Sequence, residues 1–330
     1  MEILSSSFTP RRLLITERFF EQMIEPLRAA LANRAAPGEL LEVRYVPARE
    51  LSSADLEWAD SWLGFDLPAG AIEIGFGKSG LRWIHSASDG VSQFYPAWEA
   101  MQNAGTILTN TVGTMPERIA EYVVAAVLGQ IVGLPEYREF ARQRQWARRL
   151  NPTALECAVT VIGTGRVGAM IAQRLRPFVR CVRGLSLSGV AKPEFDAVAQ
   201  LGSGDYVSDA DILVLALPDT PSTRGIVSEQ LLGQLAGAIV VNIGRGSTLD
   251  AQALHGALES GAVAHAVLDV FEREPLPEDD WRWEHPGVTI TPHVSGFTAL
   301  GDVLADFLAN LDALRAGVTP PNLIDLSGEY

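Results

Sequence analysis

Residues 157–175 read CAVTVIGTGRVGAMIAQRL, and this stretch decides the fold of the chain. Its apolar, β-branched start predicts a buried strand over Ala158–Ile162, and the recurring apolar residues near its end predict an amphipathic helix. Gly163, Gly165 and Gly168 stand between these two segments in G-x-G-x-x-G spacing. Because glycine is common in this chain, the spacing alone is a weak signal, and the strand and helix around it carry the interpretation. Together they predict a loop that binds the pyrophosphate of a dinucleotide.

The three glycines have different expected roles in such a loop. Gly163 permits a tight turn, Gly165 lets the backbone approach the pyrophosphate, and Gly168 lets the helix pack closely against the strand. The first turn of the helix then presents N–H groups to the phosphates. The alternative interpretation is a glycine-rich turn with a purely structural role.

Four more apolar runs follow the glycine-rich loop, at residues 211–217, 238–243, 263–270 and 288–291. They are almost continuously apolar, which is typical of strands buried on both faces of a parallel sheet. Helix-like segments lie between them, and one begins after Asp250, a favourable N-cap residue, and ends at Gly261. The alternation of strands and helices predicts a doubly wound α/β sheet.

The rest of the chain predicts a second lobe. Residues 1–110 form a less regular αβ region, and the residues after Thr291 hold about one helix, over 298–315, and a proline-rich tail. That tail is too short for a domain, so we expect it to pack back onto the N-terminal region. The expected division is residues 1–110 plus 296–330 as a substrate domain, with residues 111–295 inserted as the dinucleotide-binding domain.

The charge of the chain argues against nucleic acid as a partner. The 330 residues carry 26 Lys and Arg against 40 Asp and Glu, a formal net charge of −14, and an acidic surface repels phosphate backbones. The exception is the arginine-rich stretch over 138–149, which we interpret as a solvated helix face.

Cysteine use and hydropathy indicate the cytoplasm and no membrane partner. The chain has two cysteines, Cys157 and Cys181, and no CxxC pair, so neither a disulfide framework nor a metal site is expected. We find no signal-peptide pattern at the N-terminus. The longest apolar run, over 122–134, is interrupted by Gln130 and is too short to span a bilayer.

The residue expected to contact the adenosine ribose is unusual. A carboxylate normally stands about 20 residues after the glycine-rich loop and binds the ribose 2′-hydroxyl, but here Ser186 occupies that place. The absence of a carboxylate removes the repulsion of a 2′-phosphate, and Arg183 or Lys192 could reach such a group. The sequence therefore favours NADP over NAD.

Three polar residues follow predicted strands, at the sheet edge where α/β proteins place their sites. Arg245 suits an α-keto carboxylate, because its planar guanidinium can bind that group with two hydrogen bonds. His293 suits proton transfer near neutral pH. A carboxylate such as Glu274 next to it would favour the imidazolium and orient the ring.

Five motifs in this order and spacing resemble the D-isomer-specific 2-hydroxyacid dehydrogenases. They are GTGRVG, ALPDTPST, NIGRGSTLDAQAL, LDVFEREPLP and TPHVSG. The chain looks most like the glyoxylate/hydroxypyruvate reductase branch, and the match runs from about Leu81 to the closing NLID. The resemblance implies a Rossmann cofactor domain inserted in a flavodoxin-like substrate domain, an active site between the lobes, and a homodimer.

The resemblance also implies a role for each matching residue. Arg245 would bind the substrate carboxylate, His293 would be the general acid/base and Glu274 its partner, while backbone groups of Ser88, Asp89 and Gly90 would contact the substrate. The residues implied in cofactor binding are Gly163, Gly165, Arg166, Val167, Gly168, Ser186, Leu217, Pro218, Thr223, Ile243, Gly244 and Asp269. The expected reaction is hydride transfer from NAD(P)H to C2 of a small 2-keto acid, which gives a D-2-hydroxy acid.

Two alternatives stay open beside this reading. The first is a phosphoglycerate-type or other 2-hydroxyacid dehydrogenase, against which Asp89 argues, because its charge disfavours dianionic substrates at a place where the family has small neutral residues. The second is a non-catalytic protein that senses dinucleotides. Tight NADPH binding without turnover of any keto acid would favour that second alternative.

Overall fold

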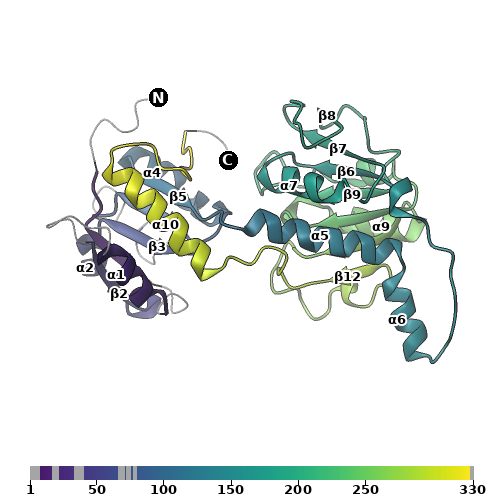
Figure 1. Ribbon diagram of the computed structural model, residues 1–330, viewed down its shortest axis with the longest axis horizontal. Helices are drawn as coiled ribbons and strands as arrows, with labels where there is room; N and C mark the ends of the chain where they lie inside the picture. The colour runs from purple at the N-terminus through teal and green to yellow at the C-terminus, as the bar shows by residue number, and fades with distance from the viewer. Residues whose placement is uncertain are drawn as a thin grey trace. The chain divides into compact units, whose positions relative to one another are not determined.

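The computed structural model describes residues 8–16, 22–32, 41–65, 71, 76 and 80–327. The chain forms two compact units, one of Met1–Met115 with Thr298–Tyr330 and the other of Pro116–Phe297 (Figure 1). In the described residues, each unit is built on one parallel sheet, of five strands in the first and seven in the second. The predicted two-lobed α/β fold is therefore confirmed.

The second unit has the strand order β12-β11-β10-β9-β6-β7-β8. The strands are β6 (Ala158–Ile162), β7 (Cys181–Ser186), β8 (Ala197–Gln200), β9 (Ile212–Leu215), β10 (Ala238–Asn242), β11 (Val263–Leu268) and β12 (Val288–Ile290). The chain moves outward from β6 in one direction and from β9 in the other, so the order reverses between these two neighbours. Such a switch point is where doubly wound sheets bind ligands.

All five predicted strands form. β6 covers the same residues as its apolar run, and the other four are one to three residues shorter than theirs. All four residues of β9 are buried, as expected for a strand covered on both faces. The helices of this unit are α5 (Met115–Ile131), α6 (Leu134–Arg142), α7 (Arg166–Leu175), α8 (Glu229–Leu232) and α9 (Ala251–Ser260). Short 3₁₀ turns lie at η4 (Ala154–Glu156), η5 (Gly246–Thr248) and η6 (Trp281–Trp283).

Two local predictions show why the elements begin and end where they do. The Asp250 carboxylate caps α9 by accepting hydrogen bonds from the N–H groups of Gln252 and Ala253, and Gly261 ends the helix at φ 79°. The apolar runs include neither β7, which contains Arg183 and has partly exposed residues along its length, nor β8. β8 is a half-buried edge strand, so no continuous apolar run marks it.

The first unit has the strand order β2-β1-β3-β4-β5, which is the flavodoxin-like order. Its strands are β1 (Arg12–Ile15), β2 (Glu42–Tyr45), β3 (Ser61–Gly64), β4 (Trp83–Ser86) and β5 (Ile107–Asn110). Its helices are α1 (Ile24–Ala32), α2 (Ser53–Trp58), α4 (Trp98–Ala104) and α10 (Leu300–Arg315), with 3₁₀ turns η2 (Ala48–Glu50) and η3 (Ser92–Ala97).

The C-terminal helix belongs to this first unit, as the sequence predicts. Figure 1 shows α10, in yellow, beside the sheet of the first unit. The buried ring of Phe307 stacks on that of Trp83 in β4, with 4.8 Å between the ring centroids. A helix from the end of the chain thus completes a core that begins at its start.

The helices of the described residues differ from a membrane-spanning helix in length or in composition. Among the described residues, no single helix is both long and apolar enough to cross a bilayer. The pair α5 and α6, bent by 60° at the break between them, passes the same test of length and composition when taken together.

A fully buried histidine lies in the core of the first unit. His85 of β4 contacts the Thr109 hydroxyl through Nδ1 at 2.8 Å and the Thr111 hydroxyl through Nε2 at 3.1 Å. Because Thr111 donates its own proton to the carbonyl oxygen of Ser86, the Nε2 atom of His85 must be the donor to Thr111. The ring is therefore a satisfied, neutral imidazole, and burial lowers its pKa to about 3.

This histidine should make stability depend on pH. In the unfolded chain His85 binds a proton below its ordinary pKa of about 6.5, whereas in the folded chain it stays neutral down to about pH 3. The free energy of unfolding therefore falls as the pH falls through this range. Between pH 7 and pH 5 the loss from this one group is about 2 kcal/mol. In urea unfolding followed by tryptophan fluorescence, His85→Gln should lack this part of the pH dependence. An equal dependence in both proteins would contradict the assignment.

Candidate active site

The predicted site residues of the second unit gather at one edge of its sheet. All its strand pairs are parallel, so the carboxyl ends of β6, β9, β10, β11 and β12 lie on the same side. The glycine-rich loop follows β6, and Arg245, Asp269 and His293 follow β10, β11 and β12. Strand direction alone therefore brings together residues that are up to 130 positions apart.

The glycine-rich loop has the geometry that a pyrophosphate needs. A Cβ on Gly168 would lie 1.9 Å from the carbonyl oxygen of Gly163, so only glycine allows α7 to pack this closely on the loop. Gly163 has φ 104°, and its own Cβ would lie 2.3 Å from the carbonyl oxygen of Ala216. A Cβ on Gly165 would meet no atom within 4 Å. Gly165 is the N-cap of α7, so open space lies at the start of a helix whose first residues are Arg166 and Val167.

The turn after β9 packs against the loop after β10. Leu217 is buried, and a Cβ on Gly244, which follows Ile243, would lie 2.5 Å from the carbonyl oxygen of Leu217. The hydroxyl of Thr223 is buried, donates to the carbonyl oxygen of Pro218 at 2.6 Å and accepts from the N–H of Thr220 at 2.9 Å. Thr223 therefore shapes this turn, and its contact with the cofactor stays a prediction.

The expected ribose position contains a hydroxyl and one nearby cation. Ser186 ends β7, and its hydroxyl accepts a hydrogen bond from the N–H of Gly189 at 3.1 Å. The ammonium of Lys192 donates to the carbonyl oxygen of Thr164, inside the glycine-rich loop. Arg183 instead forms an ion pair with Asp209 at 2.8 Å. Of Arg183 and Lys192, the two cations considered for a 2′-phosphate, it is Lys192 that lies at the glycine-rich loop.

Several hydrogen bonds fix the backbone around Arg245. Its carbonyl oxygen accepts from the Thr248 hydroxyl at 2.7 Å and from the Asn242 amide at 3.3 Å. The half-buried guanidinium donates to the carbonyl oxygen of Gly244 at 2.7 Å. This bond uses one of its five N–H donors, so the side chain can still bind a carboxylate with two hydrogen bonds.

A second set of contacts joins the loop after β9 to the loop that carries Arg245. The Asp219 carboxylate accepts hydrogen bonds from Arg224 at 2.8 Å and from the Ser247 hydroxyl at 2.9 Å. The bond from Arg224 is the main reason why the pKa of Asp219 lies below its ordinary value. Because the carboxylate stays charged, it holds the two loops together over the whole neutral range.

His293 and Glu274 form the predicted pair. The Nδ1 atom of His293 lies 2.7 Å from Oε2 of Glu274, and both side chains are partly exposed. The other carboxylate oxygen of Glu274 accepts from the N–H of Phe271 at 2.9 Å, which orients the carboxylate. With Nδ1 committed to Glu274, Nε2 is the nitrogen that can exchange a proton with a bound molecule.

The buried carboxylate of Asp269 holds the turn that carries His293. It accepts from the N–H groups of Val294 and Ser295, each at 2.9 Å, and from the Thr291 hydroxyl at 2.6 Å. The carbonyl oxygen of Asp269 also accepts from the N–H of His293 at 2.9 Å. His293 has φ 53°, a left-handed conformation that costs a non-glycine residue about 1 kcal/mol or more. These bonds therefore hold His293 in a conformation that it would not adopt alone.

The predicted substrate-contact residues Ser88, Asp89 and Gly90 lie in the first unit, directly after β4. The Ser88 hydroxyl donates to the carbonyl oxygen of Gly90 at 2.9 Å, and the side-chain amide of Asn110 donates to the carbonyl oxygen of Asp89 at 2.7 Å. Gln93 donates to the carbonyl oxygen of Gly90 at 3.2 Å. The loop is thus fixed by side chains beneath it, and its contact with a substrate stays a prediction.

The sequence analysis missed several residues that support the site. Buried Arg282 forms ion pairs with Glu272 and Asp280, which lie on either side of Glu274 in the sequence. These ion pairs fix the loop that carries Glu274. Asn242 and Thr291 are the first residues of the motifs NIGRGSTLDAQAL and TPHVSG, but the motifs alone do not reveal their supporting role. Arg282 has no motif, because its role depends on a buried ion pair that forms only when the loop folds.

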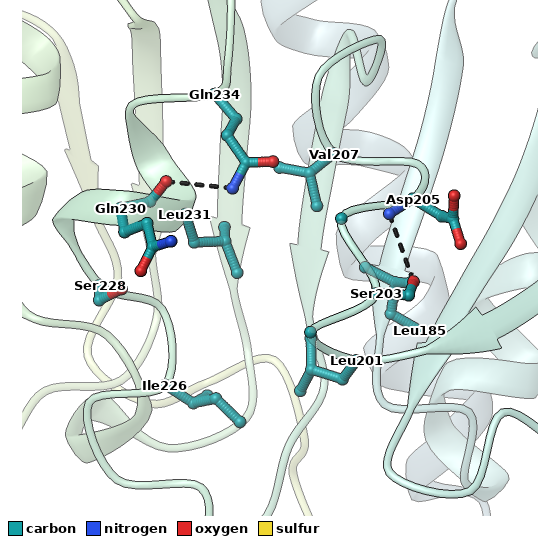
Figure 2. Close-up of a pocket in the computed structure, with 12 residues that line it drawn as sticks. Leu185, Leu201, Ser203, Asp205, Val207, Ile226, Ser228, Gln230, Leu231 and Gln234 are labelled. Carbon is teal, nitrogen blue, oxygen red and sulfur yellow. Dashed lines mark hydrogen bonds between the residues drawn. The ribbon is translucent and has the colours of Figure 1, made fainter.

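A separate pocket of about 360 Å³ lies between α8 and residues 201–207. Figure 2 shows polar side chains on both of its walls. Its apolar lining comes from Leu185, Leu201, Val207, Ile226 and Leu231. Leu185 at the end of β7 lines the pocket, whereas Ser186, Glu274 and His293 do not.

Comparison with known proteins gives these features a family. The family model described as D-isomer specific 2-hydroxyacid dehydrogenase, NAD binding domain, matches residues 124–295. The chain is 34% identical over 254 residues to glyoxylate/hydroxypyruvate reductase A of Serratia proteamaculans (strain 568), across 75% of this chain and 80% of that protein. The chain belongs to the D-isomer specific 2-hydroxyacid dehydrogenase family.

Solved structures of the family have the same fold as this dehydrogenase. A family protein from Aeromonas salmonicida subsp. salmonicida A449 superposes with a TM-score of 0.82 at 29% identity, over 96% of this chain and 100% of that one. A D-isomer specific 2-hydroxyacid dehydrogenase from Xanthobacter autotrophicus Py2, in complex with NADPH and MES, gives 0.81 at 27% identity, over 97% and 99%. The dehydrogenase described here is thus an NAD(P)-dependent enzyme of this family, as its motifs predict.

Two glycine substitutions should separate cofactor binding from folding. Gly165→Ala places a methyl group in open space at a φ of −67°, so the free energy of unfolding should change by less than about 0.5 kcal/mol. The methyl group would occupy space next to the expected pyrophosphate, so NADPH affinity should fall at least tenfold, on the order of 1.4 kcal/mol. Gly168→Ala should lose both affinity and about 1–3 kcal/mol of stability.

Urea unfolding and titration of NADPH fluorescence measure these two effects separately. The two variants serve as controls for one another, because each adds one methyl group to the same loop. Unchanged NADPH affinity in Gly165→Ala would show that the dinucleotide does not approach this backbone.

Proposed function

We propose that this dehydrogenase reduces a small 2-keto acid of the glyoxylate or hydroxypyruvate type to a D-2-hydroxy acid. The observation that carries the proposal is the 2.7 Å contact between His293 and Glu274, at the same sheet edge as Arg245. The likeness to a glyoxylate/hydroxypyruvate reductase A supports the choice of a small substrate. Asp89 in the proposed substrate loop supports it as well, because its charge disfavours the dianionic acids of a phosphoglycerate-type enzyme.

Each catalytic residue has one task in the proposed reaction. Arg245 binds the substrate carboxylate and orients the neighbouring carbonyl group. His293 gives the proton on Nε2 to the carbonyl oxygen as C2 accepts a hydride, and the product is the alcohol. Glu274 keeps the ring oriented through Nδ1 and stabilises its positive charge before the transfer. A bound reduced nicotinamide supplies the hydride.

The cofactor that we propose is NADP rather than NAD. Ser186 stands where a carboxylate would repel a 2′-phosphate, and Lys192 at the glycine-rich loop supplies a positive charge nearby. The Xanthobacter autotrophicus relative is in complex with NADPH. We assign residues 111–295 as the dinucleotide-binding domain and residues 1–110 with 296–330 as the substrate domain.

We further propose a homodimer in which α6 and residues 143–150 contact the second copy. The segment exposes Leu134, Trp146 and Leu150, the last two almost completely. Its arginines stand out on an otherwise acidic chain, so an acidic partner such as a second copy suits them. Light scattering that gave the mass of a monomer would contradict this proposal.

The location that we propose is the cytoplasm. The two free cysteines, Cys157 and Cys181, accord with this reducing compartment.

The substrate proposal is tested by small 2-keto acids in combination with NADH and NADPH, followed by loss of absorbance of the reduced cofactor. Glyoxylate or hydroxypyruvate with NADPH should be among the best pairs. His293→Ala should lower kcat by about 10²–10⁴-fold while NADPH still binds, because proton donation acts in the transition state. Good turnover of only a bulky or phosphorylated acid would contradict the substrate, and full activity of His293→Ala would contradict the mechanism.

The cofactor proposal is tested at Ser186. Two like charges about 4 Å apart repel by about 1 kcal/mol in water and by about 4 kcal/mol at an effective dielectric of 20. Ser186→Asp should therefore lower kcat/KM for NADPH at least tenfold and affect NADH far less. Lys192→Ala should shift the preference in the same direction. Arg183→Gln is the control, since Arg183 pairs with Asp209. An unchanged NADPH/NADH ratio in both test variants would remove the preference for NADP.

A further inference from the structure

A chain of hydrogen bonds runs from helix α5 to the turn that carries His293. The Tyr122 hydroxyl, on α5, lies 2.6 Å from the hydroxyl of Thr291. The Thr291 hydroxyl in turn lies 2.6 Å from Oδ1 of Asp269. Neither Tyr122 nor Thr291 bears a group that the proposed reaction needs, so the reaction does not explain why their hydroxyls are bonded to one another and to Asp269.

The direction of the bonds follows from the chemistry of the three groups. An ionised carboxylate only accepts, so Thr291 must donate its single proton to Asp269. Thr291 can then only accept from Tyr122, whose hydroxyl is the donor at the start of the chain. Burial and the nearby Asp269 raise the pKa of Tyr122, so this donor keeps its proton throughout the neutral range.

The chain ends on the atoms that decide where His293 lies. Oδ1 of Asp269 accepts from Thr291 and also from the N–H of Val294, the residue after His293. Oδ2 accepts from the N–H of Ser295, and the carbonyl oxygen accepts from His293 itself. The carboxylate is fully buried, and such a group is costly unless its hydrogen bonds are satisfied. Any shift of Asp269 would therefore move the backbone of the strained His293 and of the two residues after it.

We infer that Tyr122 and Thr291 are positioning residues that fix His293 through Asp269. The inference rests on the proposed function only in naming His293 as the residue that exchanges the proton. Tyr122 directs the proton of Thr291 toward Asp269, and Thr291 fixes the carboxylate in the rotamer that accepts from Val294 and Ser295. Helix α5 is thus the fixed support against which the catalytic turn is held.

Hydrogen exchange tests the inference without any need for turnover. Thr291→Val keeps the shape of the side chain and removes the hydroxyl, so the amides of Val294 and Ser295 should exchange at least about tenfold faster. Thr291→Ser keeps the hydroxyl and should restore the wild-type rate. Tyr122→Phe should give a smaller increase, of about threefold. Tyr137→Phe is the matched control. The Tyr137 hydroxyl accepts hydrogen bonds from the N–H of Arg149 and the side-chain amide of Asn151, so its loss should leave exchange at Val294 and Ser295 unchanged.

Kinetics with the best keto acid and NADPH supply a second readout. Thr291→Val should lower kcat about tenfold with little change in the KM for either substrate, and Thr291→Ser should stay within about twofold of wild type. Wild-type exchange rates in Thr291→Val, or equal rates in the Val and Ser variants, would overturn the inference. If the wild-type enzyme turns over no keto acid, the proposed function fails, and the exchange rates still decide the inference.

Discussion

The buried carboxylate of Asp269 is the constraint on which the loops around Arg245, Glu274 and His293 depend. It stands at the end of β11, between β10 and β12, and binds groups on the segment after β12. Its own N–H donates to the carbonyl oxygen of Asn242 at 3.0 Å, at the end of β10. A carboxylate that is buried from solvent must be satisfied by hydrogen-bond donors of the protein. If the turn that carries His293 moved away, Asp269 would lose these donors and become a buried, unpaired charge.

Close backbone contacts give this edge its rigidity. Gly244 packs against Leu217, and a Cβ on Gly246 would lie 1.9 Å from the carbonyl carbon of Phe271. These contacts place the loop of Arg245 directly against the loop of Glu274. The polar side chains therefore stand on loops that pack against one another rather than on mobile connections, which is what orientation of a small substrate requires.

The glycine-rich loop and the catalytic turn solve the same problem in opposite ways. At Gly163 and Gly168 the chain has no side chain, so that helix α7 can approach the strand and leave its N-terminus open. At His293 the chain keeps a side chain in a left-handed conformation, and hydrogen bonds to Asp269 offset the strain. Glycine suffices where only backbone is needed, whereas a side chain in this conformation must be held by its neighbours.

The sequence by itself determined five of the seven strands of the nucleotide-binding sheet, the glycine-rich loop, the cap at Asp250 and the trio of Arg245, Glu274 and His293. These are local signals, because burial on both faces, turn geometry and motif spacing are all written in neighbouring residues. Only the tertiary structure decided that Arg183 pairs with Asp209, that Thr223 is buried in its own turn, and that Tyr122 reaches Thr291. Thr223 bonds within its own turn, but its burial depends on what packs around that turn. The other two contacts join residues that are distant in the chain, and they exist only once packing has brought both partners within about 3 Å.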